Sequence, residues 1–121
     1  MGIRPSELEE RLERNERSFV LDIRPREAYQ TGAIDSSYNI PCYDSLRRGD
    51  DTPLRKRLDE LPTDAEIVVV CKQGIVAKRA TQLLTAEGYD AVTLAGGMGG
   101  WQGYKNGTVG YKIRKLLWRI F

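Results

Sequence analysis

The chain has 121 residues, 40% hydrophobic and 30% charged, with a formal net charge of +2 at pH 7. This length fits one domain that buries a core without a disulfide scaffold, and no apolar run approaches the roughly 18 residues of a membrane span. The sequence holds no histidine, which excludes Ser-His-Asp triads and the common zinc sites. We expect no metal and no cofactor, and the charged N-terminus without an apolar signal core predicts a cytoplasmic protein.

The predicted elements alternate between helices and strands along the chain. Those of the first half are a helix over 6–16 opened by a capping box of Ser6 and Glu9, a strand over 18–23, a helix over 26–31, a strand over 38–40, a loop over 44–51 and a helix over 53–61. In the second half, a β-branched strand over 66–70 precedes a helix over 74–88 and a strand over 91–94. Short strands separated by helices predict right-handed crossovers and a parallel sheet covered on both faces.

Cys71 directly follows the clearest strand, and Gly74 lies in the turn before the next helix. In open parallel sheets, ligands bind beyond the carboxyl ends of the strands. The N–H groups of the turn and the positive end of the helix dipole stabilise a thiolate relative to a thiol there, and Lys72 and Lys78 add to the field. Cys71 as a merely buried small hydrophobe at a strand end is the alternative that this segment leaves open.

Four segments resemble, in order and spacing, those of the rhodanese-like family. They are Ile3 to Leu12; Val20 to Arg24 with Glu27, Tyr29, Gly32, Ile34 and Asn39-Ile40-Pro41; Cys71 to Val76 with Ala77; and Leu94, Gly96-Gly97 and Trp101. The resemblance implies an α/β fold of three layers, with a central parallel β-sheet flanked by helices on both faces. It covers a domain over residues 1–109.

The resemblance also implies a sulfurtransferase. Sulfane sulfur would pass from thiosulfate, or another persulfide or polysulfide donor, to a thiol or protein acceptor through a persulfide on the catalytic Cys71. Such covalent catalysis relies on an activated thiolate and preorganised N–H donors. The residues expected to bind substrate are Lys72, Gln73, Gly74, Ile75, Val76 and Arg24. The residues expected to give structural support are Asp22, Gly96, Gly97 and Trp101.

Two positions carry alternatives, and the mouth of the active loop departs from the family pattern. Arg24 either meets an anionic donor or forms a partly buried ion pair with Asp22, and we favour the ion pair. Cys42 is either a resolving cysteine that attacks the Cys71 persulfide or a packing residue, and we favour packing. Many family members carry Arg or Ser late in the active loop, where this chain has Ile75 and Val76. This apolar loop mouth suits a bulkier sulfur donor or a protein acceptor.

Residues 110–121 form a basic tail outside the family pattern, with four basic and no acidic side chains. Ile113, Leu116, Leu117 and Ile120 recur at helical spacing, which predicts an amphipathic helix. Docking on the body is the favoured interpretation, and contact with a membrane surface or a partner is the alternative. A basic patch this local does not indicate nucleic-acid binding.

Two other functions fit the same fold. A Cys-based phosphatase or arsenate reductase needs an arginine that closes the loop, whereas Arg79 lies eight residues after Cys71, inside the predicted helix. A non-catalytic rhodanese-like binding module is the stronger alternative, although inactive members of the family typically lack the cysteine that this chain keeps.

Overall fold

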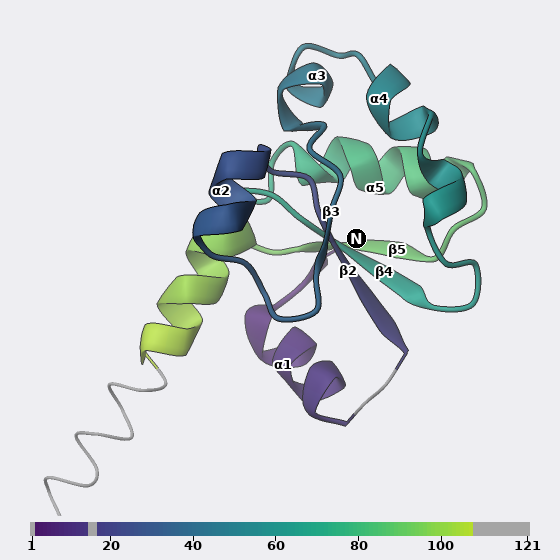
Figure 1. Ribbon diagram of the computed structural model, residues 1–121. Helices are drawn as coiled ribbons and strands as arrows, with labels where there is room; N and C mark the ends of the chain where they lie inside the picture. The colour runs from purple at the N-terminus through teal and green to yellow at the C-terminus, as the bar shows by residue number, and fades with distance from the viewer. Residues whose placement is uncertain (1, 15–16, 108–121) are drawn as a thin grey trace, which may run out of the picture.

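A five-stranded parallel sheet forms the centre of the computed structural model, which describes residues 2–14 and 17–107 (Figure 1). The strand order is β1-β5-β4-β2-β3, and every neighbouring pair runs parallel. The strands are β1 (Gly2–Ile3), β2 (Ser18–Asp22), β3 (Tyr38–Asn39), β4 (Glu66–Val70) and β5 (Ala91–Leu94). The fold class predicted from the sequence is therefore confirmed.

Helices cover both faces of this sheet (Figure 1). They are α1 (Pro5–Glu13), α2 (Arg26–Thr31), α3 (Tyr43–Arg47), α4 (Thr52–Arg55), the 3-10 helix η1 (Leu58–Glu60) and α5 (Ala77–Ala86). A further helix spans residues 97–107 and is named helix 97–107 below. Within the described part of the chain, no helix has the length and apolar character needed to cross a membrane.

Strand β4 shows how the sequence builds two cores, because successive side chains of a strand point to opposite faces. Ile67 and Val69 pack, with Cys71, in a core covered by α3, α4 and α5. Val68 and Val70 pack in a second core, which α1 and helix 97–107 cover through Leu8 and Met98, among others. Both faces of the central strand are fully buried, as its continuous apolar run predicts.

Several predicted boundaries were wrong. The segment 44–51 is not wholly a loop, because Leu46 anchors α3 in the core at 2% exposure. The helix over 53–61 is interrupted and consists of α4 and η1. The first helix begins at Pro5, and the Arg4 N–H donates to the Glu7 carboxylate at 3.3 Å, whereas a capping box of Ser6 and Glu9 was predicted. The predicted tail helix over 110–121 lies outside the described residues.

The structure also differs from prediction at the start of α5 and in the segment after β5. Helix α5 begins at Ala77 and not at residue 74, because residues 71–76 form a loop around the Cys71 sulfur. Helix 97–107 was not predicted at all. Its five glycines favour turns, but Met98 is buried in the second core and Trp101 packs against it, so tertiary packing overrides the local preference.

Candidate active site

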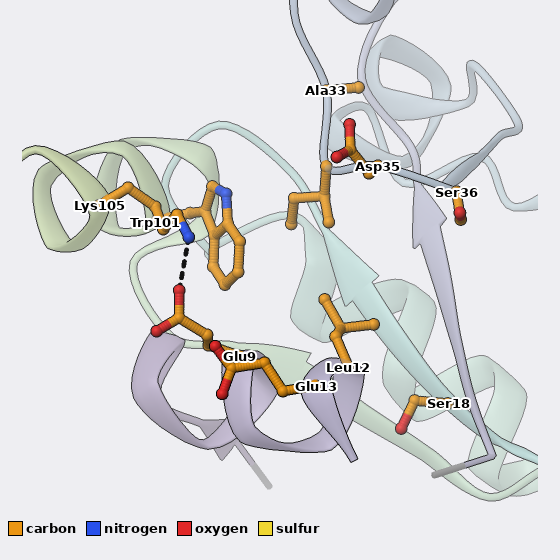
Figure 2. Close-up of a pocket in the computed structure, with 10 residues that line it drawn as sticks. Glu9, Leu12, Glu13, Ser18, Ala33, Asp35, Ser36, Trp101 and Lys105 are labelled. Atoms are coloured by element: carbon orange, nitrogen blue, oxygen red, sulfur yellow. Dashed lines mark hydrogen bonds and ion pairs between the residues drawn. The ribbon is translucent and has the colours of Figure 1, made fainter. Parts of the chain in front are cut away.

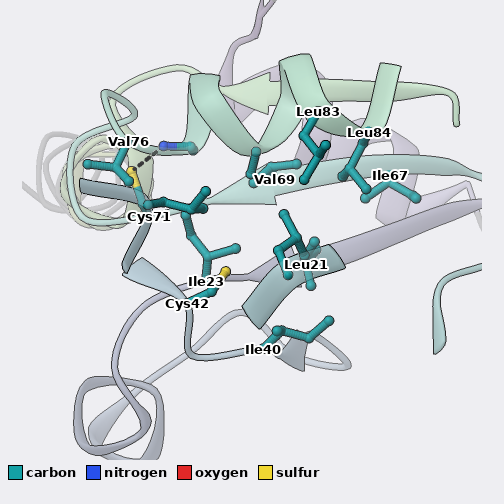
Figure 3. Close-up of a cluster of buried hydrophobic side chains, with 14 of the residues drawn as sticks. Leu21, Ile23, Ile40, Cys42, Ile67, Val69, Cys71, Val76, Leu83 and Leu84 are labelled. Carbon is teal, nitrogen blue, oxygen red and sulfur yellow. Dashed lines mark hydrogen bonds between the residues drawn. The ribbon is translucent and has the colours of Figure 1, made fainter. Parts of the chain in front are cut away.

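The Cys71 thiol lies at the carboxyl edge of the sheet, enclosed by the loop Cys71–Val76. Its sulfur accepts hydrogen bonds from the N–H of Gly74 at 3.1 Å and the N–H of Ala77 at 3.4 Å; Figure 3 draws a hydrogen bond to this sulfur. Ala77 is the first residue of α5, so the sulfur faces the positive end of the helix dipole. This arrangement places partial positive charge where a thiolate or a persulfide anion needs it.

The loop keeps its shape through close backbone contacts with the two glycines that follow β5. Gly74 has φ +84°, and a Cβ there would lie 3.1 Å from the carbonyl oxygen of Leu94 and from the nitrogen of Gly96. A Cβ on Gly97 would lie only 2.4 Å from the Cys71 carbonyl oxygen. These positions need glycine because backbone packs directly on backbone.

The first turn of helix 97–107 fixes the loop from behind. The N–H of Met98 donates to the carbonyl oxygen of Cys71 at 2.8 Å, and the N–H of Gly99 donates to that of Lys72 at 3.0 Å. This geometry supports the structural role expected for Gly96 and Gly97. The same two hydrogen bonds hold the Cys71 loop close to the end of β5.

A cavity of about 210 Å³ opens at the thiol, and its walls come from two segments. The lining residues are Tyr43, Cys71, Lys72, Gln73, Ile75 and Val76. The Lys72 ammonium lies 5.3 Å from the centroid of the Tyr43 ring, within the range of a cation–π contact. Ile75 is 70% exposed, so the mouth carries an apolar side chain beside a positive one.

Tyr43 is a wall of this cavity that sequence reasoning missed. Its N–H donates to the carbonyl oxygen of Ile23 at 2.9 Å, which holds the start of α3 beside the end of β2. The only signal in the sequence is an aromatic residue directly after Cys42, and that pattern is too common to indicate a site.

Asp22 and Arg24 form a buried ion pair instead of an open anion site. The guanidinium Nη2 lies 2.9 Å from Asp22 Oδ2 and donates at 2.7 Å to the carbonyl oxygen of Gly32. Asp22 is 1% and Arg24 6% exposed, and the Asn39 amide donates to both of their carbonyl oxygens. This network fixes the turn after β2 and favours the ion-pair interpretation.

Arg79 is engaged away from the loop. Its Nη1 donates to the carbonyl oxygens of Leu46 at 2.7 Å and Arg47 at 3.1 Å. These contacts tie the last turn of α3 to α5, so the guanidinium does not close the Cys71 loop as a phosphatase arginine must.

Cys42 and Trp101 lie apart from the loop itself. Cys42 is 1% exposed and shares a core with Cys71 (Figure 3), and burial raises the pKa of its thiol to about 12. Both cysteines are free. Trp101 packs against the second core, which faces away from the Cys71 core. This placement favours packing roles for both residues.

Comparisons with known proteins agree with this geometry. The family described as "Rhodanese-like domain" matches residues 4–104. "Putative sulfurtransferase YtwF" of Bacillus subtilis is 28% identical over 96 residues, which cover 79% of this chain and 84% of YtwF. "Thiosulfate sulfurtransferase GlpE" of Shewanella oneidensis is 30% identical over 83 residues, covering 68% of this chain and 73% of GlpE.

A solved structure shows the same similarity in three dimensions. The rhodanese-related protein of Thermoplasma volcanium superimposes with a TM-score of 0.70 at 26% identity, covering 85% of this chain and 91% of that chain. Because the family match spans most of the sequence, this chain belongs to the rhodanese-like domain family.

Proposed function

We propose that this protein is a sulfurtransferase that carries sulfane sulfur as a persulfide on Cys71. One observation carries the proposal: two backbone N–H groups, one of them at the start of α5, point at the Cys71 sulfur. The names of YtwF and GlpE support the same activity class. Covalent catalysis of this kind requires a stabilised sulfur anion, and the loop that follows β4 offers that environment through its N–H groups.

The first half-reaction is a displacement at sulfur. The Cys71 thiolate attacks the outer sulfur of thiosulfate, a new S–S bond forms, and the S–S bond of the donor breaks. Sulfite leaves with the electron pair, and Cys71 becomes a persulfide anion. In the second half-reaction a nucleophile such as cyanide or a thiolate attacks the outer persulfide sulfur, and the Cys71 thiolate departs. No net oxidant or reductant is needed in either step.

The loop offers further donors to the outer sulfur of such a persulfide. Among the residues that the structure describes, the N–H groups of Gln73, Ile75 and Val76 donate to no acceptor. Successive free N–H groups in a tight loop form an anion-binding cup. The Lys72 ammonium, held against Tyr43 at the cavity mouth, adds a charge that attracts an anionic donor.

Thiosulfate is the first donor to test, because GlpE is named for it. The exposed Ile75 at the mouth also suits a larger organic persulfide or polysulfide. The acceptor is a thiol, either small or on a protein. The cytoplasmic location stays a prediction from the sequence.

Steady-state formation of thiocyanate from thiosulfate and cyanide tests the proposal. We expect turnover by the wild type and by Cys42→Ser, and none by Cys71→Ser. Cys42→Ser is the matched control because it changes a second buried thiol in the same core. Absence of turnover by the wild type with thiosulfate and with an organic trisulfide would favour a non-catalytic binding module.

A further inference from the structure

A groove of about 550 Å³ (Figure 2) lies at the second core, and none of its lining residues lines the cavity at the Cys71 thiol. Its walls are α1, the segment 33–36 and helix 97–107. The floor is apolar, with Leu12, Ile34 and Trp101, and the rim is acidic. The acidic rim residues are Glu9, Glu13 and Asp35.

The groove already binds one ammonium group of the chain. The Lys105 Nζ lies 2.5 Å from the Glu9 carboxylate (dashed in Figure 2) and 5.6 Å from the centroid of the Trp101 ring. A carboxylate and an aromatic face together stabilise a cation more than either does alone. This contact shows which chemistry the groove accepts: a basic side chain beside an apolar surface.

Two further carboxylates of the rim form no ion pair with any residue that the structure describes. Glu13 and Asp35 are exposed, and neither forms an ion pair within residues 2–14 and 17–107. With Glu9 and Lys105 counted, the groove keeps a formal charge of −2. A partner segment that complements it needs several basic side chains and an apolar stripe.

The chain itself supplies such a segment directly after the groove. Residues 108–121, which lie outside the described part, begin three positions after Lys105. They carry four basic residues and no acidic one. Their apolar residues Ile113, Leu116, Leu117 and Ile120 recur at helical spacing.

We propose that residues 108–121 fold back and dock in this acidic groove, with the apolar stripe on Trp101 and Leu12, the half-buried apolar side chains of its lining, and the basic side chains on Glu13 and Asp35. Fourteen residues reach at most about 50 Å when extended, and the segment follows in the chain directly on helix 97–107, which forms one wall of the groove. Gly107 and Gly110 permit a sharp reversal before the amphipathic stretch.

Docking at this place links the tail to the Cys71 loop. Helix 97–107 forms one wall of the groove through Trp101 and Lys105, and its first turn donates to the Cys71 carbonyl oxygen through Met98. A segment bound along helix 97–107 adds contacts to the helix whose first turn is hydrogen-bonded to the Cys71 loop. The docked tail therefore stabilises the folded protein as a whole.

A zero-length carbodiimide cross-linker, applied to the full chain and followed by peptide mapping, tests the contact. We expect cross-links from Lys112 or Lys115 to Glu13 or Asp35 within one chain, at a yield independent of protein concentration. The double variant Glu13→Gln with Asp35→Asn should lose them. The control Glu10→Gln, an exposed acid of α1 outside the groove, should keep them.

Two results would overturn the proposal. One is a tail that cross-links only between chains, with a yield that rises with concentration. The other is a tail that cross-links to neither carboxylate while the full chain co-sediments with phosphatidylglycerol vesicles, which would indicate a membrane-binding tail.

Charge reversal gives an independent readout. Changing Glu13 and Asp35 to lysine, or changing Lys112, Arg114 and Lys115 to glutamate, should each lower the melting temperature at low salt. Combining both sets should restore it, because opposite charges again face each other. Losses that simply add in the combined variant would refute docking at this groove.

Discussion

Gly97→Ala should dismantle the active loop without touching a side chain of the site. A Cβ at this position would lie 2.4 Å from the carbonyl oxygen of Cys71 and 2.7 Å from backbone atoms of Lys72 and Gln73. All three are main-chain atoms, so relief requires the loop and helix 97–107 to separate. The residue also has φ +56°, where a side chain adds strain.

The loss in the free energy of unfolding expected for Gly97→Ala has two contributions. Left-handed strain costs roughly 1–2 kcal/mol, and overpacking against a rigid backbone costs roughly 1–3 kcal/mol. Together they remove about 2–5 kcal/mol of the free energy of unfolding. For a chain of this length, an unfolding entropy of about 2.1 cal/mol/K per residue converts this loss into a melting temperature lowered by roughly 8–20 °C.

Thermal unfolding followed by circular dichroism measures the shift, and the thiocyanate assay should show lost turnover in the folded variant. Gly103→Ala is the matched control, because it lies in the same helix with nothing within 4 Å of its Cβ position. That change should raise stability by roughly 0.5–1 kcal/mol. A Gly97→Ala protein with wild-type melting temperature and turnover would refute the backbone packing between Gly97 and the Cys71 loop.

Three further predictions follow from single contacts. Asp22→Asn should cost roughly 3–5 kcal/mol in urea unfolding, because it leaves the buried Arg24 charge uncompensated, whereas Asp64→Asn at the exposed Arg17 pair should change little. Lys72→Gln should slow the loading of sulfur from thiosulfate onto Cys71 about tenfold, roughly 1.4 kcal/mol, as measured by mass spectrometry of samples quenched at successive times. The control Lys56→Gln, at an exposed lysine outside the cavity, should leave the loading rate unchanged. Equal loading rates for the wild type and Lys72→Gln would show that Lys72 does not contribute to donor binding. Burial raises the Cys42 pKa from 9.0 to about 12, so the folded state keeps a proton that the unfolded state loses, and stability should fall as pH rises from about 9 to 12. At pH 10.5 the loss relative to pH 8 should be about 2 kcal/mol by linkage, and it should be absent in Cys42→Ala; an identical pH dependence in both proteins would contradict it.

The strands that carry the site could be predicted because their signals are local. β4 and β5 were predicted at their observed bounds, since each is a short run rich in β-branched residues, the first ending before Cys71 and the second before Ala95-Gly96. The position of Cys71 at the end of β4 followed directly. These features depend on a few adjacent residues and on the general rule that ligands bind at the carboxyl edge of a parallel sheet.

Helix 97–107 and the role of Tyr43 were not predicted, because both depend on contacts between residues distant in sequence. Helix 97–107 forms despite its glycines because Met98 is buried in the second core and the first turn donates to Cys71 and Lys72. Tyr43 reaches the cavity because its N–H bonds to Ile23, twenty residues earlier. No local sequence pattern predicts either of these contacts.

The role of the Asp22–Arg24 pair could be predicted only in part from the sequence. The sequence offered an ion pair and a substrate contact as alternatives, and the residues alone could not exclude either. The Gly32 carbonyl that accepts from Arg24, and the Asn39 amide behind the pair, favour the structural role. Both come from segments whose placement requires the folded chain.

The most direct test of the central proposal is the intact mass of the protein after incubation with thiosulfate and removal of the donor. We predict that the wild type and Cys42→Ser each gain one sulfur atom, that peptide mapping places it on Cys71, and that cyanide removes it as one equivalent of thiocyanate. Cys71→Ser should gain none. A wild type that takes up no sulfur from thiosulfate or an organic trisulfide, or equal uptake by Cys71→Ser, would contradict the persulfide mechanism.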